Sequence, residues 1–397
     1  MKKQIIKRLT ALLLAVVCTA TFYTMAYAAV VVYSNIETEH IASLADQTFN
    51  EVEYTAVGGI ATGKYRTSMF VLKSEKKTTS YTEQKAVFFD YPNIESNTTD
   101  PHIYLLPYAG HANAMTIDDN NIYICGWTKI ENNVGNQKNN TYNNWIIKIP
   151  RNLFSSFRKL DNGDTLPKDN KNTTAVEGYS ILYPQVKVID ANGAVTYEKY
   201  KNVINAITLH NDNGEFIINY PLKGRGYDKA FTTAKLETDS AGSTYFVVSE
   251  DPEDIFVVEN NVQYQNATDQ DICYSPGHGL FVPKWYGKKY KEDGTTVSEY
   301  YNETKNVIMW ADIDGDFEYK NIKGVNYRYY TPDKINVNKT SEKNNSGQQI
   351  YNKFEVESIA FTVDGDMLFS SNIDSINGTV DSVFKLTHDN GQKFLLS

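Results

Sequence analysis

A hairpin pattern recurs five times along this chain and constrains its fold more than any other feature. Each copy has a polar residue or glycine, a small or polar residue, isoleucine or methionine, a polar turn and a second apolar strand. A strand, a tight polar turn and another strand form a β-hairpin. The copies are GGIATGKYRTSMFVL from Gly58, NAMTIDDNNIYICGW from Asn113, NAITLHNDNGEFIINY from Asn205, QDICYSPGHGLFVP from Gln270 and ESIAFTVDGDMLFSS from Glu357.

Further apolar segments follow the hairpins and predict units of four strands. Third strands are expected at AVFFDY, WIIKIP, AFTTAKL, NVIMWADI and SVFKLT, and fourth strands at IYLLP, YFVVSE, FEYKNI and the C-terminal KFLLS. The chain is rich in tyrosine and phenylalanine, which favour strands, and it has no convincing helical periodicity outside the leader. A repeated four-stranded unit predicts an all-β fold of the β-propeller type.

The number of blades follows from the number of hairpins, which gives five. The hairpins are unevenly spaced, and Asn- and Lys-rich stretches such as ENNVGNQKNNTYNN read as inserted loops. One spare strand pair, ILYPQVKVID with AVTYEKYKNV, leaves six or seven blades as an alternative. A β-sandwich or a two-domain arrangement is the remaining alternative.

The N-terminal segment has the pattern of a secretory signal peptide. A basic start, MKKQIIKR, precedes an apolar stretch of about fifteen residues, which is shorter than the roughly twenty that cross a bilayer. Cleavage is expected after Ala28, so we expect residues 1–28 to be the signal and residues 29–397 one propeller domain. The mature protein is then secreted, without a membrane span, and monomeric.

Charge limits the partners that the mature protein can take. The leader carries four basic residues and no acidic ones, so its removal changes the formal net charge from -9 to -13. Such a charge disfavours nucleic acid, because it repels the phosphate backbone. Glycans, peptides, surface proteins and divalent cations remain compatible with it.

Polar residues at the start of each hairpin are the candidate binding site. The first strand of each propeller blade lines the central channel, so the residues that begin these strands meet at one channel mouth. Amide and carboxylate oxygens are ligands that Ca²⁺ prefers, and Asp271 would add a second negative charge. The alternative is that these groups line a water-filled channel. The candidate ligand-binding residues are His111, Asn113, Asn205, Gln270, Asp271 and Glu357.

The histidines do not form an evident catalytic pair. His111 lies two residues before Asn113 at the predicted mouth, where it is either a general base or a loop-packing and ligand-contact residue. His210 and His278 lie in turns that lead to the opposite face, about 16 Å or more away. A dyad with His111 is therefore excluded by the predicted fold.

Acidic turns and cysteines are predicted to be structural. The segments IDDNN, HNDNG and VDGD contain the residues that tight hairpins need. In DIDGDFE the glycine is at the fourth position and not at the sixth, and Lys323 occupies the closing acidic position of an EF-hand. At most this segment forms a looser calcium loop. Cys125 and Cys273 fall on non-adjacent blades of a five-bladed ring, so both are expected to be buried free thiols.

Two hairpins resemble those of a known propeller group. NAMTIDDNNIYI and ESIAFTVDGDMLFSS are similar to segments of gluconolactonase and streptogramin-lyase propellers and of the broader secreted NHL-like group. In the lactonase branch a divalent metal is held by Glu, Asn and Asp side chains at the starts of inner strands. The resemblance implies Asn113, Asn205 and Glu357 as metal ligands. The first hairpin departs from the pattern because it offers only glycine.

Three functions remain from the sequence. The first is a non-catalytic extracellular binding module that uses the channel mouth and the loops between blades. The second is a calcium-dependent hydrolase or lyase of the lactonase-like kind, and the third is a glycoside-active enzyme. Sequence motifs of serine hydrolases, HExxH metalloproteases and P-loop proteins are absent.

Overall fold

The computed structural model describes most of the strands that the repeat predicts. The described residues are 36–44, 47–49, 52–54, 56–62, 68–73, 86–91, 102–106, 109–112, 114–134, 137–156, 174–176, 178–211, 214–221, 229–258, 268–269, 271–276, 279–290, 297–311, 328–330, 346, 351–362, 364–375, 378–379 and 381–388. Their regular structure is β-strand apart from one short 3₁₀ helix, η3 (Arg151–Ser156), so the all-β prediction is confirmed. None of the helices in these ranges is long and apolar enough to cross a membrane.

The chain divides into two units, Met1–Ile36 and Glu37–Ser397, and nearly all described residues belong to the second. The predicted signal peptide lies outside the described residues. The prediction of one domain over residues 29–397 is not tested by this division.

The first two sheets each begin with a predicted hairpin. The first has the order β4-β5-β6-β7 and the second β11-β12-β10-β9-β8. Their strands are β4 (Ala56–Thr62), β5 (Ser68–Lys73), β6 (Ala86–Tyr91), β7 (His102–Leu106), β8 (Ala114–Ile117), β9 (Asn121–Val134), β10 (Gln137–Pro150), β11 (Thr174–Val176) and β12 (Tyr179–Leu182).

The third and fourth sheets follow the same plan. The third has the order β14-β13-β18-β17-β16-β15, with β19 on β17, and the fourth β20-β22-β23-β24, with β21 on β22. Their strands are β13 (Pro184–Ile189), β14 (Val195–Lys199), β15 (Ile207–Asn211), β16 (Glu215–Tyr220), β17 (Lys229–Thr238), β18 (Thr244–Val248), β19 (Phe256–Val258), β20 (Thr268–Asp269), β21 (Cys273–Ser275), β22 (Gly279–Tyr290), β23 (Val297–Ala311) and β24 (Arg328–Tyr330).

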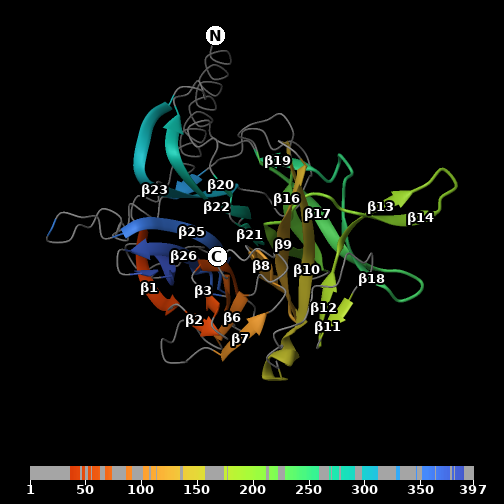
Figure 1. The fold of residues 1–397 in the computed structure, drawn as a ribbon, viewed down its shortest axis with the longest axis horizontal. Helices are drawn as coiled ribbons and strands as arrows, with labels where there is room; N and C mark the ends of the chain where they lie inside the picture. The colour runs from red at the N-terminus through yellow and green to blue at the C-terminus, as the bar shows by residue number, and fades with distance from the viewer. Residues whose placement is uncertain are drawn as a thin grey trace, which may run out of the picture. The chain divides into compact units, whose positions relative to one another are not determined.

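The fifth sheet joins the two ends of the folded unit, in the order β1-β28-β26-β25 with β27 on β26. In Figure 1 the blue strands β25 and β26 belong to the same sheet as the red strand β1, which is separated from β26 by β28. A separate small hairpin pairs β2 with β3. The strands are β1 (Ile36–Leu44), β2 (Gln47–Phe49), β3 (Val52–Tyr54), β25 (Tyr351–Phe361), β26 (Met367–Ser375), β27 (Gly378–Thr379) and β28 (Asp381–His388).

The first strands of the five sheets contact one another in a closed cycle. β4 contacts β8, β8 contacts β15, β15 contacts β21, β21 contacts β25, and β25 contacts β4. A cycle of inner strands with sheets extending outward from it is a β-propeller. Five such sheets fall within the described residues, while five as the blade number of the whole chain stays a prediction.

Side chains, and not strand ladders, join neighbouring inner strands. The Thr116 hydroxyl accepts a hydrogen bond from the Leu209 amide at 3.0 Å. The Thr208 hydroxyl accepts one from the Tyr274 amide at 2.9 Å. These bonds satisfy backbone donors that have no ladder partner at the junctions, which explains the small polar residues in the repeat.

One junction uses glycine because the backbones approach too closely for a side chain. A Cβ atom on Gly58 would lie 2.1 Å from the Ala112 carbonyl oxygen. Only glycine fits such an approach without displacing the neighbouring backbone. The glycine that begins the first hairpin is therefore a packing residue between the first two sheets.

Apolar packing fills the spaces between the sheets. One buried cluster spans the first and second sheets, another the second and third, and a third joins the fifth sheet to the first. Aromatic pairs also cross the junctions: the ring centroids lie 4.8 Å apart for Tyr123 and Phe216, between the second and third sheets, and 4.7 Å apart for Phe281 and Phe361, between the fourth and fifth sheets. The core thus lies between the sheets.

Two outer strands differ from the predictions. The C-terminal KFLLS was expected beside β28, but β1 occupies that position and residues 393–397 lie outside the described residues. FEYKNI also lies outside them, and β24 pairs with β23 in the fourth sheet. A strand supplied by the opposite end of the chain leaves no local signal in the sequence, so the pattern missed it.

The spare strand pair does not form a sheet of its own. β12 pairs with β10 in the second sheet, whereas β13 pairs in parallel with β18 and carries β14 at the edge of the third sheet. The segment that suggested a sixth blade therefore extends two existing sheets.

Candidate functional site

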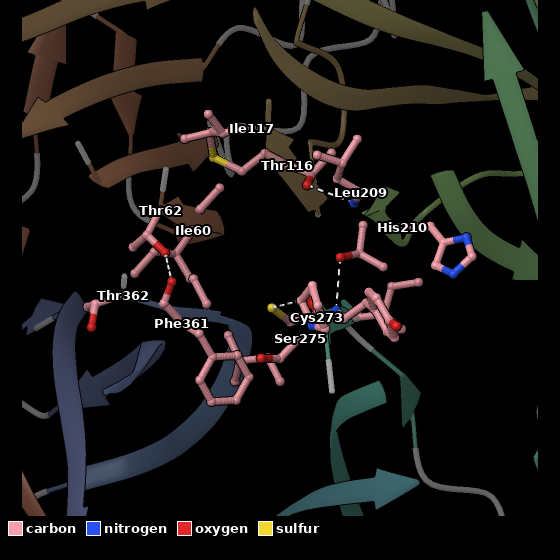
Figure 2. A pocket seen from close by; sticks show the side chains of 18 of the residues that line it. Ile60, Thr62, Thr116, Ile117, Leu209, His210, Cys273, Ser275, Phe361 and Thr362 are labelled. Carbon is pink, nitrogen blue, oxygen red and sulfur yellow. Dashed lines mark hydrogen bonds between the residues drawn. The ribbon is translucent and has the colours of Figure 1, made fainter. Parts of the chain in front are cut away.

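A pocket lies in the channel, at the end where the inner strands lead into their hairpin turns. Its volume is about 620 Å³, and all five inner strands contribute to its wall. In Figure 2 the labelled residues surround the pocket, with Ile60 and Thr62 facing Leu209 and His210 across it. The lining comprises Ile60–Thr62, Met115–Ile117, Thr208–Asn211, Ile272–Pro276 and Ile359–Thr362.

Among the described residues that line this pocket, the imidazole of His210 is the one titratable nitrogen base. The described wall otherwise consists of aliphatic, aromatic, hydroxyl, thiol and amide groups, and no carboxylate or ammonium group is among the described lining residues. Several hydroxyls already hold the ring together: Thr62 donates to the Phe361 carbonyl, and Thr116 and Thr208 accept backbone amides. The pocket is therefore largely apolar with a few fixed polar groups, the usual make-up of small-ligand sites.

His210 lies at the edge of the pocket and has fixed partners. Its Nδ1 is 2.9 Å from Glu215 Oε2, and its ring meets Tyr274 edge to face at 5.1 Å. Asn211 also donates to Glu215, at 2.8 Å. The turn that was expected to be structural thus also orients an imidazole beside the pocket.

Asp271 lies at the other end of the inner strands and is fully buried. One carboxyl oxygen contacts the Ser358 hydroxyl and the other accepts the Ile272 amide at 2.7 Å. Ser358 in turn accepts the Ile60 amide at 3.0 Å, and its hydroxyl lies 3.3 Å from the Ile60 carbonyl. Asp271 is therefore part of the ring closure between the fourth, fifth and first sheets and is covered from solvent.

The hydrogen-bond count favours a protonated Asp271. The Ser358 hydroxyl has one proton but two acceptors within reach, the Asp271 carboxyl and the Ile60 carbonyl. If Asp271 donates to Ser358, then Ser358 donates to Ile60 and every group is satisfied. Burial raises the pKa of Asp271 well above its ordinary value, although bonds from Ser358 and backbone amides act in the opposite direction.

The other predicted site residues occupy different surroundings. Glu357 is buried, with 4% of its surface exposed. The backbone N–H of Asn205 donates a hydrogen bond to Asn219 Oδ1 at 2.9 Å. His111 donates from its backbone to the Trp127 carbonyl, and its ring lies 4.4 Å from that indole, which is a loop-packing arrangement.

Two candidates, Asn113 and Gln270, lie outside the described residues. The ligand set of Asn113, Asn205 and Glu357 and a bound Ca²⁺ accordingly stay predictions. Elsewhere in the described part of the chain, no three His, Cys, Asp or Glu side chains gather as a metal site.

The two cysteines differ in access. Cys125 is fully buried, whereas Cys273 is half-buried, so the expectation of two buried thiols holds only for the first. Cys273 lines the pocket, and Figure 2 shows its sulfur directed toward the middle. Burial, and then the nearby Asp271, raises the pKa of Cys273 to about 12.

The pocket residues were not singled out from the sequence, although a signal for them existed. Ile60, Met115 and Ile359 each lie two residues beyond a predicted strand start. Because side chains two apart on a strand share a face, these positions face the channel with the starts. These residues, toward the turn-side end of that face, line the pocket.

No protein-family model matches the chain, and no curated protein sequence matches it. Among solved structures, a protein of unknown function from Dyadobacter fermentans has 8% identity and a TM-score of 0.39, with 88% of this chain and 99% of that one covered. An exo-1,5-α-L-arabinanase from a bovine ruminal metagenomic library has 8% identity and a TM-score of 0.35, covering 87% and 97%.

A third similar structure is a GH32 β-fructofuranosidase from Bombyx mori, with 7% identity and a TM-score of 0.37. The match covers 86% of this chain and 61% of the fructofuranosidase, so this chain spans about three-fifths of that protein's length. At such TM-scores and identities, these likenesses carry no argument about activity or ligands.

Proposed function

We propose that this protein is a secreted, non-catalytic binding module whose channel pocket takes an uncharged segment of an extracellular glycan. One observation carries the proposal: five inner strands enclose a pocket of about 620 Å³ whose described wall has no carboxylate or ammonium group. Burying a charged ligand against such a wall would leave its charge without a partner, which is costly. An uncharged ligand avoids that penalty.

A sugar residue suits the mixture of groups in the wall. Phe361 and Tyr274 offer aromatic surface for the apolar face of a sugar ring, and Ser275 and Asn211 offer polar atoms at the rim. Glycosidases generally use two carboxyl groups flanking the scissile bond. The described wall contains none, which favours binding over hydrolysis.

The proposal is tested by screening the purified protein on a glycan array and repeating the screen with a variant whose pocket is filled by a larger side chain. Leu209→Trp places a bulky side chain at the pocket while keeping the backbone amide that bonds to Thr116. Leu236→Trp makes the same change on β17, away from the pocket, and serves as the control. We expect the wild type and the control to bind a neutral glycan, with at least tenfold weaker binding by Leu209→Trp.

Two results would contradict the proposal. Equal binding by Leu209→Trp would place the glycan elsewhere on the protein. Release of shorter sugars from a bound glycan would make the protein an enzyme, which a chromatographic assay of the incubated glycan detects.

A further inference from the structure

A second cleft opens where two parallel strands of the third sheet separate. β13 pairs with β18 only from Pro184 to Val186, opposite Phe246–Val248. Beyond that point β13 continues as a hairpin with β14. After β18, the backbone amide of Ser249 donates a hydrogen bond to the Thr233 carbonyl. In Figure 1 the β13–β14 hairpin extends away from β18. Within the described ladders, residues 187–189 have no strand on the edge that faces away from β14.

This cleft is large enough for a peptide segment and has an apolar floor. Its volume is about 770 Å³, and its wall includes Val186, Val188 and Val248. At its rim Ile189 leaves 63% of its surface exposed, and it is one of only two large apolar side chains so exposed among the described residues. An apolar floor beside an open strand edge is the arrangement that binds an extended peptide by strand addition.

The charges around the cleft are mainly negative. Five carboxylates and two ammonium groups line it. Glu237 holds both ammonium groups, with distances of 3.0 Å to Lys187 and 3.2 Å to Lys235. The remaining acids include Glu250 and Asp251, which are exposed on the segment that follows β18.

We infer that the cleft between β13 and residues 249–254 binds an extended, basic peptide segment. The segment pairs through its backbone with residues 187–189, so that alternate side chains point to opposite sides. Apolar side chains on one side cover the valine floor, and lysine or arginine side chains on the other meet Glu250 and Asp251. This site lies on the third sheet and shares no lining residue with the channel pocket, although Glu215 in its wall contacts His210 and Asn211 of that pocket. Peptide binding here does not depend on the proposed glycan binding.

The inference is tested with a synthetic peptide of alternating lysine and valine, Lys-Val-Lys-Val-Lys-Val-Lys, labelled for fluorescence anisotropy. Glu250→Lys reverses a charge at the cleft, and Glu39→Lys makes the same change at an exposed position on β1. We expect Glu250→Lys to weaken binding about tenfold or more and Glu39→Lys to leave it within about twofold. A peptide N-methylated at every residue keeps its side-chain charges but loses all of its backbone donors, and we expect it not to bind.

Three results would overturn the inference. If both variants weaken peptide binding equally, binding depends only on the net charge of the protein. Undiminished binding of the N-methylated peptide would exclude strand addition. Concentration-dependent dimerisation that Glu250→Lys abolishes would assign the cleft to a second copy of this chain.

Discussion

At the scale of single residues, Asp271 shows how a polar residue at a strand start can be structural. The sequence placed it at an open channel mouth, as a ligand-binding residue. The structure buries it against Ser358 and the Ile272 amide, where it links the inner strands of two sheets. Sequence pattern identifies which residues begin the inner strands, but it does not say which end of the channel stays open.

The raised pKa of Asp271 predicts that stability falls as the pH rises. Asp271 has a higher pKa in the folded state than in the unfolded chain, so between these two pKa values the folded protein holds a proton that the unfolded chain has released. Its contribution to the free energy of unfolding is complete below the ordinary pKa of aspartic acid. This contribution is lost as the pH rises toward the folded pKa. Across that range the free energy of unfolding falls by about 1.4 kcal/mol per pH unit. Urea denaturation at a series of pH values measures it.

Asp271→Asn is the variant that isolates this effect, because the amide donates to Ser358 without titrating. We expect its stability to vary less with pH than that of the wild type and to exceed it at mildly alkaline pH, while Asp119→Asn, at an exposed turn, keeps the wild-type profile. Burial, and then Asp271, also raises the pKa of the Cys125 and Cys273 thiols. Parallel pH profiles for the wild type and Asp271→Asn would refute a protonated Asp271.

At the scale of elements, the sequence predicted what is local and missed what is not. The five hairpins and the third strands were identified because apolar strands and polar turns lie close together in the chain. β1 was missed because its partner, β28, is distant in sequence. β12 overlaps the predicted strand ILYPQVKVID, but its pairing with β10 was not predicted. Nothing in IETEHIASL indicates that it pairs with β28, the last strand of the described part of the chain.

The pairing of β1 with β28 makes a prediction about Ile41. This side chain is 7% exposed and packs in the cluster that contains Leu368 and Val383 of the fifth sheet. We expect Ile41→Ala to lower the free energy of unfolding by about 2–4 kcal/mol, measured by urea denaturation. The control, Ile189→Ala at an exposed position, should change it by less than about 0.5 kcal/mol. Equal effects of the two variants would mean that β1 does not pack in the closing sheet.

At the scale of the whole molecule, the cycle of inner strands determines where a ligand can enter. The ring closure between Asp271, Ser358 and Ile60 is buried, whereas the turn-side end holds a pocket whose described wall has no carboxylate or ammonium group. The repeat predicted the channel, but the residues that line its open end depend on packing between sheets that are far apart in sequence. The glycan site that we propose therefore lies at the turn-side end of the channel.

Alkylation of the native protein, mapped by peptide mass spectrometry, shows whether a pocket is open at this end of the channel. Cys273 lines the pocket and Cys125 is fully buried, so N-ethylmaleimide at mildly alkaline pH should label Cys273 slowly and Cys125 hardly at all. Leu209→Trp should slow the labelling of Cys273, while Leu236→Trp should not. Equal labelling of the two cysteines, or a Cys273 rate unchanged by Leu209→Trp, would contradict a pocket at this end of the channel.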